Sequence, residues 1–236
     1  MKKKRLPKKH RMKNYIIKNS EIIQEKLASS FYDKPINIVN PFINPINFKS
    51  VLSQLESYIP LHLTHNLDGI YIGDFKDFKK NNRDVNASYK DGGIFVSNEQ
   101  DDEADLIDDI IHEIGHSLEG QYKDHLYGDE VLEGEFLSKR RTLYHLLDDN
   151  KEKSLMDFLD PEYSLDFDMF LYQTLGYDYL RLASANLFYS PYGITSLREY
   201  WADGFENYFL GDRRKLKELS PILYNKIKAL VDNEIE

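Results

Sequence analysis

The feature that most constrains this chain is the run His112-Glu113-Ile114-Gly115-His116, which lies in a segment with helical periodicity. Residues four apart share one face of a helix, so both imidazoles can reach a single metal ion, with Glu113 beside it. Apolar residues recur through the segment at helical spacing: Leu106, Ile107, Ile110, Ile111, Ile114 and Leu118. We expect a helix here, with His112 and His116 as metal ligands and Glu113 as a general base.

Composition narrows the choice of further ligands. The 236 residues suit a single domain, and they include no Cys. A thiolate site and a Cys nucleophile are therefore excluded, so the metal must rest on imidazoles and carboxylates. Zinc suits such ligands, and a zinc ion held by two His needs a third protein ligand while its fourth position is kept for water.

Charge is distributed unevenly along the chain. Residues 1–18 contain nine Lys or Arg and no acid, whereas the rest contains 22 basic and 40 acidic residues. We expect 1–18 to be a disordered basic arm; alternatively, it binds an acidic partner, a membrane surface or nucleic acid. No Sec signal peptide follows the arm, and no apolar run is long enough to cross a membrane. These features favour an intracellular location, or delivery by a specialised or phage-borne route.

The order of predicted elements indicates an α+β fold in which residues 19–236 form one domain. A small sheet region comes first, and a mostly helical half follows, with the metal site in the cleft between them. Expected strands are Ile36–Val39, Ile70–Ile72, Ala87–Tyr89 and Ile94–Ser97, the last two joined as a hairpin through Lys90-Asp91-Gly92-Gly93. Expected helices cover 12–30, 47–58, 106–120, 129–149, 151–159, 162–189, 195–210 and 221–233.

The third ligand is sought among later residues. A third His six residues beyond His116 would complete a three-His site, but Tyr122 stands there. Glu199 is the best candidate, because it lies in an apolar and aromatic helix where a carboxylate needs a partner or a metal. Asp203, one turn later, would accept a hydrogen bond from a metal-bound His. Glu133 and Glu135, on an earlier helix, remain alternatives; Asp108 is expected to face solvent.

These motifs resemble those of the gluzincin metallopeptidases of the anthrax lethal factor catalytic-domain type, which include the Pro-Pro endopeptidases. The resemblance covers about 65–233 and implies a zincin-like fold. It also implies a catalytic Tyr seven residues before the Glu ligand, which is Tyr192 here. It further implies that an edge strand pairs with an extended peptide, which would be Gly93–Ser97 (Gly93, Ile94, Phe95, Val96 and Ser97). The 83 residues between His116 and Glu199 indicate a helical insertion within 121–175.

The function expected from the residues and the resemblance is zinc-dependent hydrolysis of a peptide bond, with a protein or peptide as substrate. Zinc would be held by His112, His116 and Glu199, Glu113 would accept a proton from water, and Tyr192 would donate to the oxyanion. A non-catalytic zinc-binding or assembly protein with the same fold is the competing class. A gluzincin that uses Glu133 or Glu135 as its third ligand is a further alternative.

Overall fold

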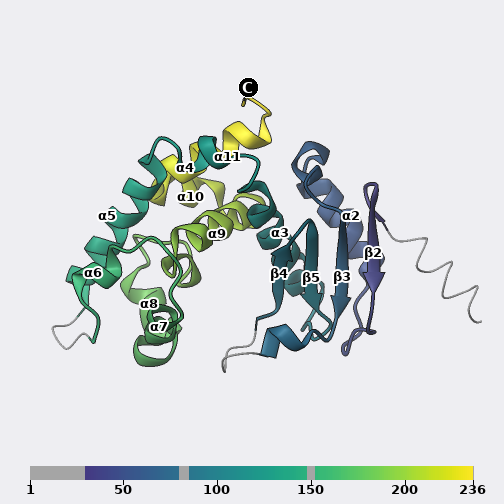
Figure 1. The fold of residues 1–236 in the computed structure, drawn as a ribbon, viewed down its shortest axis with the longest axis horizontal. Helices are drawn as coiled ribbons and strands as arrows, with labels where there is room; N and C mark the ends of the chain where they lie inside the picture. The colour runs from purple at the N-terminus through teal and green to yellow at the C-terminus, as the bar shows by residue number, and fades with distance from the viewer. Residues whose placement is uncertain (1–29, 80–84, 148–151, 236) are drawn as a thin grey trace, which may run out of the picture.

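The computed structural model describes residues 30–79, 85–147 and 152–235. The predicted basic arm lies outside the described residues, as does the predicted helix over 12–30 except for Ser30, which begins a strand. A small mixed sheet with its covering helices forms one half, and a mostly helical half follows it (Figure 1). The expected α+β class is therefore confirmed. No helix within the described ranges combines the length and apolar character needed to cross a membrane.

The sheet has five strands in the order β1-β2-β3-β5-β4. Their bounds are Ser30–Phe31 for β1, Lys34–Ile38 for β2, Gly69–Gly73 for β3, Ala87–Lys90 for β4 and Gly93–Ser97 for β5. Strands β2, β3 and β5 are parallel, while β1 and β4 are antiparallel to their neighbours. The predicted hairpin is confirmed: Asp91 and Gly92 both have positive φ (48° and 84°), as a two-residue type I′ turn requires.

The prediction that Gly93–Ser97 pairs with an extended peptide substrate is wrong. Strand β5 lies between β3 and β4 and is hydrogen-bonded on both sides, so it offers no free backbone to a peptide. Among the described strands, β1 and β4 form the two edges, and β4 is the strand nearest the helical half (Figure 1). The hairpin explains the difference, because it adds β4 outside β5 on the side facing the helices.

Helices α2 (Phe48–Tyr58) and α3 (Glu103–Leu118) pack with the sheet through one core. Helix α3 begins where Asp102 accepts hydrogen bonds from the backbone N–H groups of Ala104 and Asp105. The predicted apolar stripe of α3 is buried, and it shares the core with inward-facing strand residues: Ile36, Ile70, Ile72, Ile94 and Val96. The core thus fixes which face of α3 is left for His112 and His116.

Helix α9 (Leu197–Leu210) lies against α3 at close range. A Cβ atom at Gly115 would lie 3.3 Å from Ala202 Cα and from Phe205 Cβ, so the absence of a side chain permits this approach. The indole Nε1 of Trp201 donates to the carbonyl oxygen of Gly115 at 2.8 Å, which fixes the register of the two helices. Gly115, within the His-Glu-x-x-His run, thereby brings α9 close to the face of α3 that carries His112 and His116.

Short helices fill most of the predicted insertion. Their bounds are Lys123–Tyr127 (α4), Val131–Leu146 (α5), Leu155–Phe158 (α6), Leu165–Met169 (α7), a π-helical turn at Phe170–Leu175 (η3) and Tyr177–Ala183 (α8). Short 3₁₀ turns occur at Leu61–Thr64 (η1), Lys76–Lys79 (η2) and Tyr192–Ile194 (η4). The chain ends with α10 (Arg213–Leu219), which was not predicted, and α11 (Pro221–Val231). The helical character of this half was thus predicted correctly, but α4 and α10 were not predicted, and the helix predicted over 162–189 is divided into α7, η3 and α8 and ends at Ala183.

Candidate metal centre

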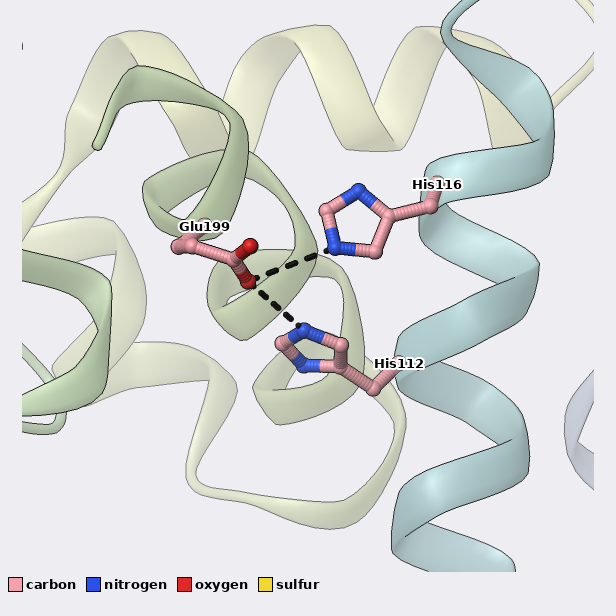
Figure 2. A group of neighbouring side chains, drawn as sticks. All are labelled: His112, His116 and Glu199. Atoms are coloured by element: carbon pink, nitrogen blue, oxygen red, sulfur yellow. Dashed lines mark hydrogen bonds and ion pairs between the residues drawn. The ribbon is translucent and has the colours of Figure 1, made fainter. Parts of the chain in front are cut away.

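Three side chains from two helices converge on one point (Figure 2). Glu199 Oε2 lies 3.1 Å from His112 Nε2 and 3.3 Å from His116 Nε2. The two imidazoles extend from successive turns of α3, and Glu199 reaches them from the first turn of α9. Ser196 caps that turn, its hydroxyl accepting a hydrogen bond from the backbone N–H of Glu199.

These distances suit a shared metal ion. Ligand atoms about 2.0–2.1 Å from a tetrahedral ion are about 3.3 Å from one another, close to both observed separations. Within the described residues, His112, His116 and Glu199 are the group of three that could hold a metal. Two imidazole nitrogens and one carboxylate oxygen form a donor set that fits zinc and leaves one tetrahedral position free.

The carboxylate of Glu135, one of the alternative third ligands, contacts the start of α11. It accepts hydrogen bonds from the hydroxyl of Tyr200 and from the backbone N–H groups of Ile222 and Leu223. It therefore caps the first turn of α11, whose N–H groups have no partners within the helix. Glu133 belongs to none of the metal-binding groups found among the described residues.

The role predicted for Asp203 is wrong. Glu206 Oε2, and not Asp203, lies 3.1 Å from His112 Nδ1, and Glu119 Oε1 lies 2.6 Å from His116 Nδ1. Glu206 follows Glu199 by seven residues, about two turns, so it lies on the same side of α9 as Asp203 and has a longer side chain. Carboxylates in this position fix the orientation of a metal-binding imidazole.

Asp203 instead orders the segment that carries Tyr192. The hydroxyl of Ser190 donates to Asp203 Oδ1 at 2.6 Å and accepts from the backbone N–H of Tyr192 at 3.2 Å. A Cβ at Gly193 would lie 2.8 Å from Asp203 Oδ2, so only Gly lets the chain pass this close. Asp203 thus fixes the backbone of Tyr192, whose ring centroid lies 5.7 Å from that of His112.

Two carboxylates beside the ligands were missed from the sequence as site residues. Glu119 binds Arg198 through two hydrogen bonds, of 2.8 and 3.1 Å, and accepts from the hydroxyl of Tyr127 at 3.1 Å. Glu206 is hydrogen-bonded to Asp108, so the expectation that Asp108 faces solvent is wrong. The signal available was weak: Glu119 follows His116 by three residues, a spacing that brings side chains together on a helix.

A cavity of about 330 Å³ opens beside the ligands. Its lining comes from β4 and the residues before it, from α3, from the inserted region, and from η4 and the start of α9: Val85, Ala87, Ser88, Tyr89, Glu113, His116, Tyr163, Tyr192, Ser196, Arg198 and Glu199. Glu113 is buried, with 6% of its surface exposed, and its carboxylate accepts a hydrogen bond from the backbone of Tyr89. Glu113 and Tyr192 therefore share one cavity with two of the three candidate ligands.

Burial and charged neighbours shift the pKa values of the side chains in this site. Burial opposes a charge on His116, but hydrogen bonds to Glu119 and Glu199 outweigh it and raise its pKa to about 9. The pKa of His112 is also raised, against the effect of burial, by Glu199 and Glu206. Burial raises the pKa of Glu113, whereas the two imidazoles hold the pKa of Glu199 far below its usual range despite burial. Without a metal the site therefore retains protons that an ion must displace.

Glu119 and Glu206 are expected to orient the two imidazoles, so replacing either carboxylate should lower the affinity for zinc. Glu119→Gln and Glu206→Gln are each expected to weaken zinc binding by about 10–100-fold, because each imidazole loses its charged partner. Competition with a chromophoric chelator would measure this change. Glu130→Gln, an exposed position before α5, is the matched control. Unchanged affinity in both site variants would show that neither carboxylate orients a ligand.

Comparisons of the chain with protein-family models, with curated protein sequences and with solved structures gave no match. The case for a function therefore rests on the residues of the site. That case consists of the convergence of His112, His116 and Glu199, and of a cavity that His116 and Glu199 share with Glu113 and Tyr192.

Proposed function

We propose that this protein is a zinc-dependent endopeptidase with a zincin-like fold. The observation that carries the proposal is the convergence of His112, His116 and Glu199 beside a cavity that also contains the buried Glu113. A structural zinc site is closed by four protein ligands, whereas this group supplies three. When bound, zinc would act as a Lewis acid that polarises the substrate carbonyl and lowers the pKa of water to about 7.

Glu113 and Tyr192 supply the proton chemistry in this proposal. Glu113 accepts the proton of the attacking water and then transfers it to the leaving amine, a role favoured by its raised pKa. The Tyr192 hydroxyl donates a hydrogen bond to the oxyanion as the carbonyl becomes tetrahedral. Asp203, through Ser190, holds the Tyr192 backbone in place for that contact.

Strand β4 replaces β5 as the substrate-binding edge. Ala87, Ser88 and Tyr89 line the cavity, and the backbone of Tyr89 reaches the Glu113 carboxylate. An extended peptide that adds to this edge would gain backbone hydrogen bonds along its length. Its scissile carbonyl would then lie beside Glu113 and the metal ligands, which favours a polypeptide over a small molecule as substrate.

The competing function is a zinc-binding or assembly protein without catalysis. Cobalt(II) can replace zinc, and its visible spectrum reports a change of ligands. We expect acetohydroxamate to shift the spectrum of the cobalt-loaded protein, because a catalytic site keeps one position open. A spectrum characteristic of four protein ligands and insensitive to acetohydroxamate would support the competing function.

Zinc binding should strengthen as pH rises. In the metal-free protein the pKa of His116 is raised to about 9, so His116 keeps its proton below that pH. The stability that the protonated His116 contributes is fully present below about pH 6.5 and is lost as pH rises through 9. Zinc binds the neutral imidazole, so the stabilisation of the protein by zinc increases as pH rises. We expect the zinc-induced rise in melting temperature to grow between pH 6 and pH 9, measured by calorimetry. A decrease over this range would contradict the assignment of His116.

A further inference from the structure

The inserted region contributes one wall of the cavity through a single aromatic side chain. Tyr163, in the segment that joins α6 to α7, lines the cavity together with Tyr89 and Tyr192. No other residue of the insertion, within the part of the chain that the structure describes, lines this cavity. Tyr163 is 49% exposed, so the position of its ring depends on what holds its hydroxyl and its backbone.

The hydroxyl of Tyr163 is held by a buried acid. It donates a hydrogen bond of 2.9 Å to Asp168 Oδ2, and Asp168 is fully buried in α7. The neighbouring backbone is attached directly to α9, because the N–H of Leu197 donates to the carbonyl oxygen of Pro161 at 2.8 Å. Leu197 precedes Glu199 by two residues, so the segment carrying Tyr163 contacts the turn that supplies the third ligand.

A buried Arg side chain also holds the segment that carries Tyr163. Arg140, 1% exposed, donates to the carbonyl oxygens of Asp157 and Asp160 at 2.8 and 2.7 Å. Its guanidinium lies 4.2 Å from the ring centroid of Phe167, a stacking contact that Arg favours. The loop is therefore held at both ends, and Tyr163 is placed on a rigid support as a selective binding site requires.

The charged residues that line the cavity all have protein partners. Arg198 is bound by Glu119, Glu199 and His116 by each other, and Glu113 by the backbone of Tyr89. A charged substrate side chain would therefore have to compete with one of these existing pairs, and burying it unpaired would be costly. The rest of the wall consists of Ser88, Ser196 and a larger set of rings and small aliphatic groups: Val85, Ala87, Tyr89, Tyr163 and Tyr192.

We propose that Tyr163 is a specificity-determining residue that selects an apolar side chain in the peptide next to the bond to be cleaved. This inference rests on the proposed function, because it assigns the substrate preference of the same site. Tyr163 and residues of β4 line the same cavity, so a peptide added to β4 would place one side chain in that cavity beside the Tyr163 ring. Asp168 is the positioning residue, acting through the Tyr163 hydroxyl.

The test uses capped decapeptides of Gly and Ser that differ only in their central residue: Leu, Phe, Ser, Lys or Glu. The zinc-loaded wild type should have higher kcat/KM for the Leu and Phe peptides. Tyr163→Ala should lower the Leu-to-Ser ratio of kcat/KM by at least about tenfold, the scale on which apolar pockets discriminate. Tyr163→Phe keeps the ring but loses the hydrogen bond to Asp168, so it should lower the ratio less than Tyr163→Ala does. Tyr179→Ala, an exposed Tyr on α8 outside the cavity, serves as the control.

A binding measurement separates the failure of this inference from that of the proposed function. Zinc-loaded Glu113→Gln protein, with and without Tyr163→Ala, is titrated with the same peptides, and the Leu-to-Lys ratio of Kd is compared. If no peptide is cleaved by wild type but Tyr163→Ala abolishes the Leu preference in binding, the endopeptidase proposal fails and Tyr163 keeps its role. An unchanged ratio in both assays, or a wild-type preference for Lys or Glu, would overturn the inference.

Discussion

Glu113→Gln is expected to leave one zinc ion bound while it lowers kcat/KM for peptide cleavage by about 10²–10⁴-fold. The amide occupies the same space beside His112 and His116 but accepts no proton from water. Glu113 is 6% exposed and its carboxylate reaches the backbone of Tyr89, so the isosteric change keeps the packing. Cleavage kinetics and metal content, determined on the same preparation, would measure both parts of the prediction.

The matched control is Glu218→Gln, which makes the same chemical change at an exposed position on α10. Its activity and zinc content should equal those of the wild type. If Glu113→Gln retained full cleavage with zinc bound, Glu113 would not be the general base. If instead it lost zinc, the loss of activity would report the metal site and not the proton transfer.

Glu199→Gln should remove stoichiometric zinc from the purified protein. An amide is a poorer zinc ligand than a carboxylate, and His112 and His116 alone hold the ion weakly. We expect zinc affinity to fall by more than about a hundredfold, beyond the loss caused by removing an orienting partner. Glu133→Gln, on α5, should bind zinc like the wild type, because Glu133 lies in no metal-binding group of the described residues. Competition with a chelator and elemental analysis would compare the two variants.

The opposite pattern would contradict the ligand assignment. If Glu199→Gln kept one zinc ion with wild-type affinity while Glu133→Gln lost it, the observed convergence of Glu199 with both imidazoles would not reflect the metal-bound state. Circular dichroism of both variants would check that neither loss results from unfolding.

Helical periodicity in the sequence allowed much of the candidate metal site to be predicted. His112, Glu113 and His116 share one helix, so their spacing alone brings them together. Glu199 was found because a carboxylate in an apolar helix needs a partner. These predictions succeeded because each depends on contacts within one helix, or on the cost of burying one charge.

The errors concern contacts between elements. Asp203 and Glu206 lie on the same side of α9, and which one reaches His112 depends on how α9 meets α3. That geometry is set by the approach at Gly115, which no helical periodicity reveals. Strand order was missed for a similar reason: the hairpin is local, but whether β4 or β5 forms the sheet edge depends on pairing with β3.

The central claim is tested most directly by incubating the zinc-loaded protein with a mixture of unstructured peptides and identifying new termini by mass spectrometry. The account predicts internal cleavage that stops when a chelator removes zinc and returns when one equivalent is restored. A protein that binds one zinc ion at His112, His116 and Glu199 yet cleaves no peptide under these conditions would contradict it.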